Sequence, residues 1–294
     1  MTREQEIYRV TIWGGVCNAL LVTFKFVAGI VGNSSAMVAD AVHSLSDFLT
    51  DILVLVFVRI SAIPQDKSHE YGHGKYETIA SFIIALGLLA VAVGIIVGGA
   101  KKLALWLHGE DLAAPGRIAL WAALLSIALK ELLFQYTVRR GKAIESQALI
   151  TNAWHHRSDA VSSIGAALGI GGALLLGDRW TVLDPIAGII VGAMLVKTSV
   201  DLVRGSMDDL AEGSLPEQTE QEILQIIRSV PDVKDPHNLR TRHIGNRIAV
   251  EVHVRMDGDT PLREAHERAS LIEGRLRERF GSHTHVSVHM EPVK

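Results

Sequence analysis

Six long apolar stretches limit what this chain can fold into. They cover residues 10–31, 35–60, 79–100, 118–138, 148–176 and 182–203. Each reaches the ~20 residues that an α-helix needs to cross a bilayer. A backbone inside hydrocarbon has to pair its polar groups within its own segment, which favours helices. Residues 1–205 are therefore predicted to form a multi-pass α-helical membrane domain with six transmembrane helices.

The second stretch carries a polar stripe that lipid cannot explain. Asp40, His43, Asp47 and Asp51 follow one another at spacings of three, four and four. On an α-helix with about 3.6 residues per turn, these spacings place all four side chains on one face. Such a stripe has to face the helix bundle or an aqueous path. Asp40 and Asp51 either line an ion path or hydrogen-bond to neighbouring helices, and the spacing leaves both roles open.

The fifth stretch contains a matching pair, His155 and Asp159. The second and fifth helices are expected to run antiparallel, so this pair can meet His43 and Asp47 at a similar depth. Two imidazoles and two carboxylates suit tetrahedral Zn²⁺, and two carboxylates cancel the charge of the ion. The alternative is a pair of structural polar contacts between helices. Two such pairs in membrane segments favour the metal site.

The chain changes character near residue 206, where a charged region without any spanning segment begins. Residues 216–230 and 262–280 have helical patterns. Residues 238–244 and 247–255 are predicted strands around Gly245-Asn246, a hairpin signal, and residues 285–291 alternate again. The order αββαβ predicts a small α+β domain at residues 206–294.

Two further groups of residues have the chemistry of metal ligands. Asp66, His69 and His73 lie in one short loop, where spacing alone favours a solvated loop as much as a metal site. The C-terminal domain holds seven of the 13 histidines: His237, His243, His253, His266, His283, His285 and His289. His253 and His289 fall on the polar faces of predicted strands, and Glu291 shares the face of His289. Ordinary surface histidine is the alternative, above all for His243 and His283.

Charge gives weaker indications. The net charge of -3 offers no reason to expect a nucleic-acid partner. Basic residues are more frequent at the N-terminus and in the second and fourth loops than in the first and fifth, which favours cytoplasmic N- and C-termini. The third loop is a counterexample, with Lys101, Lys102 and Arg117. The adjacent Lys130 and Glu131 in the fourth stretch are expected to satisfy each other's surroundings.

Four motifs carry a resemblance to a known family: HSLSD at 43–47, HEYGHGK at 69–75, HHRSD at 155–159 and HNLRTR at 237–242. At these residues the chain resembles the cation diffusion facilitator family of divalent-metal transporters, especially the bacterial ferrous-iron and zinc efflux members. The resemblance covers nearly the whole chain. It implies six membrane helices followed by a cytosolic domain of metallochaperone-like αββαβ fold, in the bacterial cytoplasmic (inner) membrane.

The resemblance also implies roles for individual residues. It places the central transport site at His43, Asp47, His155 and Asp159, and a loop site at Asp66, His69 and His73. It places a binuclear cytosolic site at His237, His253, His266, His289 and Glu291. Some relatives have Asp in place of His43, and the His is associated with zinc and cadmium selectivity. Met290 and Glu291 depart from a relative's pattern. A homodimer with facing cytosolic domains is implied, with a charge cluster of Lys75 and Asp208, Asp209 or Glu212.

These observations predict a transporter and not an enzyme. The expected activity is export of Zn²⁺ from the cytoplasm in exchange for H⁺ by alternating access, with Cd²⁺, Fe²⁺, Co²⁺ and Mn²⁺ as further candidate ions. Zinc bound at the cytosolic histidines would regulate transport. One alternative is a metal-regulated membrane scaffold with little transport. The other is an intramembrane metal-dependent hydrolase, which the lack of an HExxH motif disfavours.

Overall fold

The computed structural model describes residues 3–61, 63, 65–143, 147–245 and 247–293. The side chains of residues 3–11, 50–61, 141, 147–152, 155, 156, 158 and 161 lie outside that description. The chain divides into two compact units, which we describe separately. The helical unit comprises Met1–Ile52 and Ile84–Leu202, and the C-terminal unit comprises Leu53–Ile83 and Val203–Lys294.

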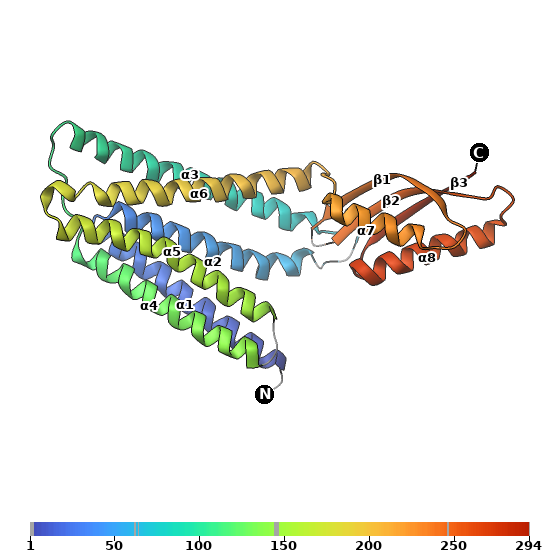
Figure 1. Ribbon diagram of the computed structural model, residues 1–294, viewed down its shortest axis with the longest axis horizontal. Helices are drawn as coiled ribbons and strands as arrows, with labels where there is room; N and C mark the ends of the chain where they lie inside the picture. Colours follow the sequence, from blue (N-terminus) through green and yellow to red (C-terminus); the bar gives the residue numbers. More distant parts are fainter. Residues whose placement is uncertain (1–2, 62, 64, 144–146, 246, 294) are drawn as a thin grey trace. The chain divides into compact units, whose positions relative to one another are not determined.

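Six long helices run through the first two-thirds of the chain (Figure 1): α1 (Arg3–Val31), α2 (Ser35–Ser61), α3 (Lys75–Leu107), α4 (Arg117–Ala143), α5 (Gln147–Leu175) and α6 (Leu183–Leu210). A short 3₁₀ helix, η1 (Asp178–Trp180), precedes α6. Among the described residues, four segments are long and apolar enough to cross a membrane: Ile12–Val31, Lys75–Leu107, Arg117–Arg140 and Asp178–Leu210. The prediction of six spans is thus confirmed for four, since α2 and α5 carry polar residues and are only partly described.

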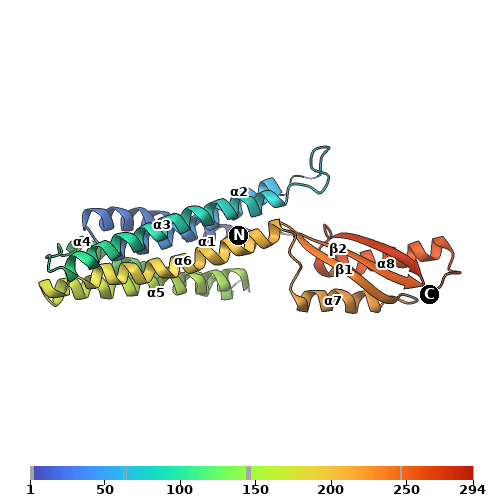
Figure 2. The ribbon, with the colours of Figure 1, turned by 90° about the horizontal axis from the view of Figure 1, so that it is seen from above.

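Small residues allow the helices of the helical unit to approach one another closely. The buried cluster between helices consists mostly of alanine: Ala28, Ala36, Met37, Ala119, Ala122, Ala123, Ala166, Ile170 and Ala187. A Cβ at Gly169 of α5 would lie 2.3 Å from the Cβ of Ala187 on α6. A Cβ at Gly99 of α3 would lie 2.6 Å from the Ile189 side chain, and both views show α3 and α6 side by side (Figures 1 and 2). Such close packing is typical of membrane helices.

The C-terminal unit contains a three-stranded sheet and two helices: α7 (Glu217–Arg228), β1 (Lys234–Ile244), β2 (Arg247–Met256), α8 (Leu262–Phe280) and β3 (His285–Pro292). The strand order is β1-β2-β3; β1 pairs with β2 antiparallel, and β2 pairs with β3 parallel. The αββαβ order predicted from the sequence is confirmed. β1 begins four residues before the predicted strand, and its first part is irregular, with register shifts on both sides of His237.

The core of the C-terminal unit lies on one face of the sheet. Val250, Val252 and Val254 of β2 are buried there as the alternating pattern predicted, and both helices cover them with Ile223, Ile227, Ile272 and Leu276. Each fully buried side chain of this size contributes about 1.5–3 kcal/mol through the hydrophobic effect. His253 alternates with these valines along β2 and therefore lies on the face of the sheet opposite the core.

Candidate metal sites

The helix site consists of His43 and Asp47 on α2 and Asp159 on α5. Each residue offers one ligand atom, and the three atoms lie within 4.8 Å of one another. The four-residue spacing within α2 sets His43 and Asp47 one turn apart on the same face, as predicted. Asp159 is buried, and the two α2 residues are half-buried. The side chain of His155, the expected fourth ligand, lies outside the described residues.

Lys130, which was expected to interact with the adjacent Glu131, instead faces the helix site. Lys130 of α4 is 2% exposed, and its Nζ lies 3.8 Å from Oδ2 of Asp159. The adjacent Glu131 instead pairs with Arg157, 3.7 Å away. The expectation that Lys130 and Glu131 satisfy each other's surroundings is therefore wrong. The helix turns by about 100° between neighbours, so the two side chains point in different directions.

A second buried ion pair lies one turn along α2 from the helix site. The Lys25 Nζ is 2.7 Å from Oδ2 of Asp40, and both side chains are fully buried. Lys25 also donates hydrogen bonds of 2.9 Å to Ser44 and Ser163. Asp40 accepts further bonds from the hydroxyls of Ser162 and Ser163. Asp40 thus forms hydrogen bonds and an ion pair with residues of α1 and α5. The side chain of Asp51 lies outside the described residues. The sequence did contain a signal for this ion pair: Lys25 lies in an apolar stretch, and a charge there needs a buried partner.

The loop site brings together Asp66, His69 and His73, whose ligand atoms lie within 4.8 Å of one another. Oδ1 of Asp66 accepts hydrogen bonds from the hydroxyl and backbone N–H of Ser68 and from the backbone N–H of His69. These bonds, with the Ser68 hydroxyl foremost, lower the pKa of Asp66 to about 2. The carboxylate is therefore ionised at neutral pH and available to a cation.

The loop packs against the hairpin between β1 and β2 within the C-terminal unit. A Cβ at Gly74 would lie 2.5 Å from the carbonyl oxygen of Ile244, so only glycine permits this approach. Lys75 pairs with Glu212, one of the partners that the resemblance implied, here within one chain. Glu212 also pairs with Arg242 at 2.8 Å, and the Arg242 guanidinium lies over the Tyr71 ring. These contacts hold the loop site beside the sheet.

The sheet site lies on the face of the sheet opposite the core and comprises His237, His253 and Glu291. Cross-strand register creates it, because His237 is paired with His253 and His253 with His289. Nδ1 of His253 is 3.0 Å from Oε1 of Glu291, and Nε2 of His237 is 3.4 Å from Oε2. The hydrogen bond to His253 is the main cause that lowers the pKa of Glu291.

Two other predicted ligands of the cytosolic site lie further out. Nε2 of His289 is 3.9 Å from Oε1 of Glu291, and its side chain is 64% exposed. His289 therefore stands at the open edge of the sheet site. His266 is exposed on α8, which covers the core face of the sheet, and the structure does not bring it together with the other ligands within one chain.

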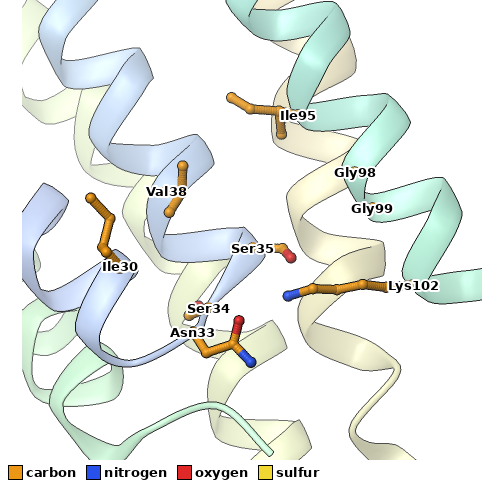
Figure 3. A pocket seen from close by; sticks show the side chains of 10 residues that line it. Ile30, Asn33, Ser34, Ser35, Val38, Ile95, Gly98, Gly99 and Lys102 are labelled. Atoms are coloured by element: carbon orange, nitrogen blue, oxygen red, sulfur yellow. The ribbon is translucent and has the colours of Figure 1, made fainter. Parts of the chain in front are cut away.

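A separate cavity of about 340 Å³ lies near the connection between α1 and α2. Figure 3 shows Lys102 extending from α3 toward Ser35 and Asn33. The ten residues that line this cavity include no carboxylate and no imidazole. Nearby, Asp184 of α6 accepts hydrogen bonds from the backbone N–H groups of Ser35 and Ala36 and so caps the start of α2. This cavity lacks the ligands for a divalent cation.

Comparisons with known proteins agree with this layout. Residues 12–211 match a family model described as the cation efflux transmembrane domain. Residues 215–293 match a second model, the cytoplasmic domain of cation efflux proteins. We call residues 215–293 the cytoplasmic domain from here on.

Similar proteins occur in plants and bacteria. Metal tolerance protein C1 of Arabidopsis thaliana is 34% identical over 281 residues, which cover 92% of this chain and 59% of the plant protein. The manganese efflux system protein MneP of Bacillus subtilis is 32% identical over 294 residues, covering 99% of this chain and 97% of the relative. The metal-bound C-terminal domain of the CzcD transporter from Thermotoga maritima is 27% identical, with 26% of this chain and 94% of that chain covered and a TM-score of 0.23.

Proposed function

The chain belongs to the cation efflux (cation diffusion facilitator) family of metal transporters, and we propose that it exports Zn²⁺ from the cytoplasm in exchange for protons. The family consists of transporters and not of enzymes. The observation that carries the proposal is the helix site, where an imidazole and two carboxylates from two helices converge within 4.8 Å. His155 is proposed as the fourth ligand.

The ligand set supports zinc as the substrate. Nitrogen and oxygen ligands together suit Zn²⁺, whereas Mn²⁺ prefers oxygen ligands. The two carboxylates can neutralise the charge of the ion in a buried site. Cd²⁺ and Fe²⁺ are expected as weaker substrates, and Co²⁺ also accepts this ligand set. Manganese is the second candidate, because a relative with 32% identity over nearly its whole length is named a manganese efflux protein.

Proton exchange follows from energetics and from the chemistry of imidazole. Moving one charge against 100 mV takes ~2.3 kcal/mol, and a dication takes about twice that. A ligating histidine has to be neutral, so metal binding and protonation exclude each other at the same imidazole. On the outer side, protons displace the ion from His43 and His155. On the cytoplasmic side, the protons leave and metal binds again, while the helices alternate between the two openings.

The sheet site is proposed to regulate transport. Three ligands in the sheet site leave a coordination position open toward solvent, which suits exchange with cytoplasmic metal. We propose a homodimer in which metal at His237, His253, His266, His289 and Glu291 stabilises the contact between facing cytoplasmic domains. Residues 1–205 form the transport domain in this proposal, and residues 206–294 form the regulatory domain. Both termini face the cytoplasm, and the membrane is the bacterial inner membrane.

The experiment is metal flux in proteoliposomes that enclose a dye responsive to both zinc and manganese. Wild type should move zinc faster than manganese, and a proton gradient should accelerate the zinc flux. Asp47→Ala and Asp159→Ala should each reduce flux to background in folded protein, while Asp178→Asn, at an exposed carboxylate outside the site, should keep wild-type flux. Full activity in either alanine variant rejects the helix site. Absence of flux in wild type favours a metal-regulated scaffold instead.

A further inference from the structure

Lys130 is a buried cation that the transport cycle described above does not use. It lies on α4 with 2% of its surface exposed, and its Nζ is 3.8 Å from Oδ2 of Asp159. Within the described part of the chain, this ammonium has no hydrogen-bond partner. A charged group in the interior of membrane helices is costly unless another group compensates it. Among the described residues, the carboxylate in ion-pair contact with Lys130 is Asp159 of the helix site.

The other buried lysine shows what a permanent structural ion pair looks like in this protein. Lys25 is 2.7 Å from Asp40 and donates two hydrogen bonds to serines. Lys130 instead remains beyond hydrogen-bonding distance of the carboxylate it faces. Its four-carbon stem also allows the ammonium to move while the backbone stays in place. Lys130 is thus near enough to compensate charge and is not fixed by hydrogen bonds.

Resting on the proposed function, we infer that Lys130 is a tethered cation that compensates Asp159 when the helix site is empty and yields when a divalent ion binds. The helix site holds ligand atoms of Asp47 and Asp159 within 4.8 Å of each other and of His43. Two such charges repel each other, and Lys130 offsets one of them. An arriving dication then meets the like charge of Lys130. The lysine therefore stabilises the empty carrier and weakens metal binding.

This arrangement would serve a transporter that has to release its ion and return empty. Export requires release on the far side, which weaker binding favours. It also requires the metal-free helices to reorient with their carboxylates still buried, which a resident cation makes easier. Lys130 acts through Asp159 and does not itself ligate the metal, because an ammonium has no free lone pair.

The first test measures zinc binding and thermal unfolding of the full-length protein in detergent. Lys130→Met keeps the length of the side chain and removes the charge. We expect the zinc affinity to rise at least tenfold, equivalent to about 1.4 kcal/mol. We also expect the metal-free protein to unfold at a lower temperature and saturating zinc to restore the loss. Lys130→Arg should behave like wild type. Lys102→Met removes a lysine from the separate cavity of Figure 3 and should change neither quantity.

The second test compares net zinc efflux with zinc–zinc exchange in proteoliposomes. Exchange at equal zinc on both sides needs only the loaded carrier to reorient, whereas net transport needs the empty carrier to return. In Lys130→Met, net efflux should fall at least tenfold relative to exchange. Loss of both in equal proportion, or wild-type affinity, would overturn the inference. A variant that fails to fold even with saturating zinc would show a structural role and also overturn it.

These outcomes are separable from failure of the proposed function. If wild type binds zinc but moves none, the transport proposal fails while the affinity and unfolding measurements still decide the role of Lys130. If wild type transports zinc and Lys130→Met keeps the wild-type ratio of net efflux to exchange, the transport proposal stands and the tethered cation is rejected.

Discussion

The helix site and the sheet site use the same ligand types in opposite surroundings. In the helix site, His43 and Asp47 come from one helix and Asp159 from another, so the ligands separate if the helices move. In the sheet site, His237 and His253 stand opposite each other on hydrogen-bonded neighbouring strands, which fixes their separation. The first arrangement suits an ion that has to be released. The second suits an ion that equilibrates with solvent and reports its concentration.

The helical unit and the cytoplasmic domain also differ in the size of the side chains that form their cores. The helical unit is held by a cluster made mostly of alanines, whose small side chains let the helix backbones approach closely. The cytoplasmic domain is held by branched aliphatic side chains such as Ile227, Val252 and Ile272, which interdigitate and resist rearrangement. We therefore expect the helical unit to change shape more readily than the cytoplasmic domain.

The largest expected difference between the regions concerns transport after loss of ligands. Asp47→Asn should lower zinc flux at least 100-fold, because it removes an obligatory charge from the path of the ion. His237→Ala combined with His253→Ala should lower flux only about fivefold, the low end of the 1–3 kcal/mol by which regulation typically couples two sites. Zinc flux in proteoliposomes over a range of zinc concentrations measures both. Equal losses at every zinc concentration would place the sheet site in the transport path and reject its regulatory role.

The second difference concerns packing. Ile272→Ala leaves a cavity in the cytoplasmic core and should destabilise that domain by about 2–5 kcal/mol, measured by chemical denaturation of the full chain. Ala123→Leu should instead prevent close approach of helices in the alanine cluster and lower the yield of folded protein. Gly274→Ala on α8, where an added Cβ meets nothing within 4 Å, is the matched control and should not destabilise. A harmless Ala123→Leu would show that the alanine cluster tolerates bulk.

Selectivity gives an effect of intermediate size. His43→Asp replaces an imidazole by a third carboxylate, and oxygen ligands favour Mn²⁺ over Zn²⁺ relative to nitrogen. The ratio of zinc to manganese flux should fall by about tenfold, the equivalent of one 1.4 kcal/mol step. The same substitution at His253 should leave this ratio unchanged. An unchanged ratio in His43→Asp would assign selectivity to another residue.

The smallest effect concerns pH at the sheet site. The hydrogen bond from His253 lowers the pKa of Glu291 below its ordinary value of 4.5. A lowered pKa means that the contribution of this carboxylate is complete above about pH 4.5 and is lost only below it. Loss of zinc at mildly acidic pH should therefore follow competition between protons and metal for the histidine ligands, because a ligating imidazole has to be neutral.

This expectation can be checked by zinc titrations at pH 5.5, 6.5 and 7.5 in an Asp159→Ala background. Glu291→Gln should lower the affinity by a similar factor at each pH, whereas His253→Ala should flatten the pH dependence. A pH dependence that disappears in Glu291→Gln would contradict the assignment. The zinc affinity of the loop site should show the same pH dependence, because Asp66, with a pKa of about 2, also stays ionised over this pH range.

Periodicity made part of this arrangement predictable. The four-residue spacing of His43 and Asp47 and the alternation in β2 each depend on one element alone, and both predicted faces agree with the structure. Lys130 facing Asp159 could not be predicted, because a sequence does not say which side of α4 meets α5. The irregular start of β1 was also missed, since Asp235 and Asn238 adopt positive φ, which few side chains favour.

In the proposed function, the helix site alone carries the ion. Zinc flux through a variant that lacks the other two sites, with His69, His73, His237 and His253 replaced by alanine, tests it most directly. We expect reduced but proton-accelerated zinc flux, which vanishes when Asp159→Ala is added. Flux that is already absent in the first variant, or that persists after Asp159→Ala, would contradict it.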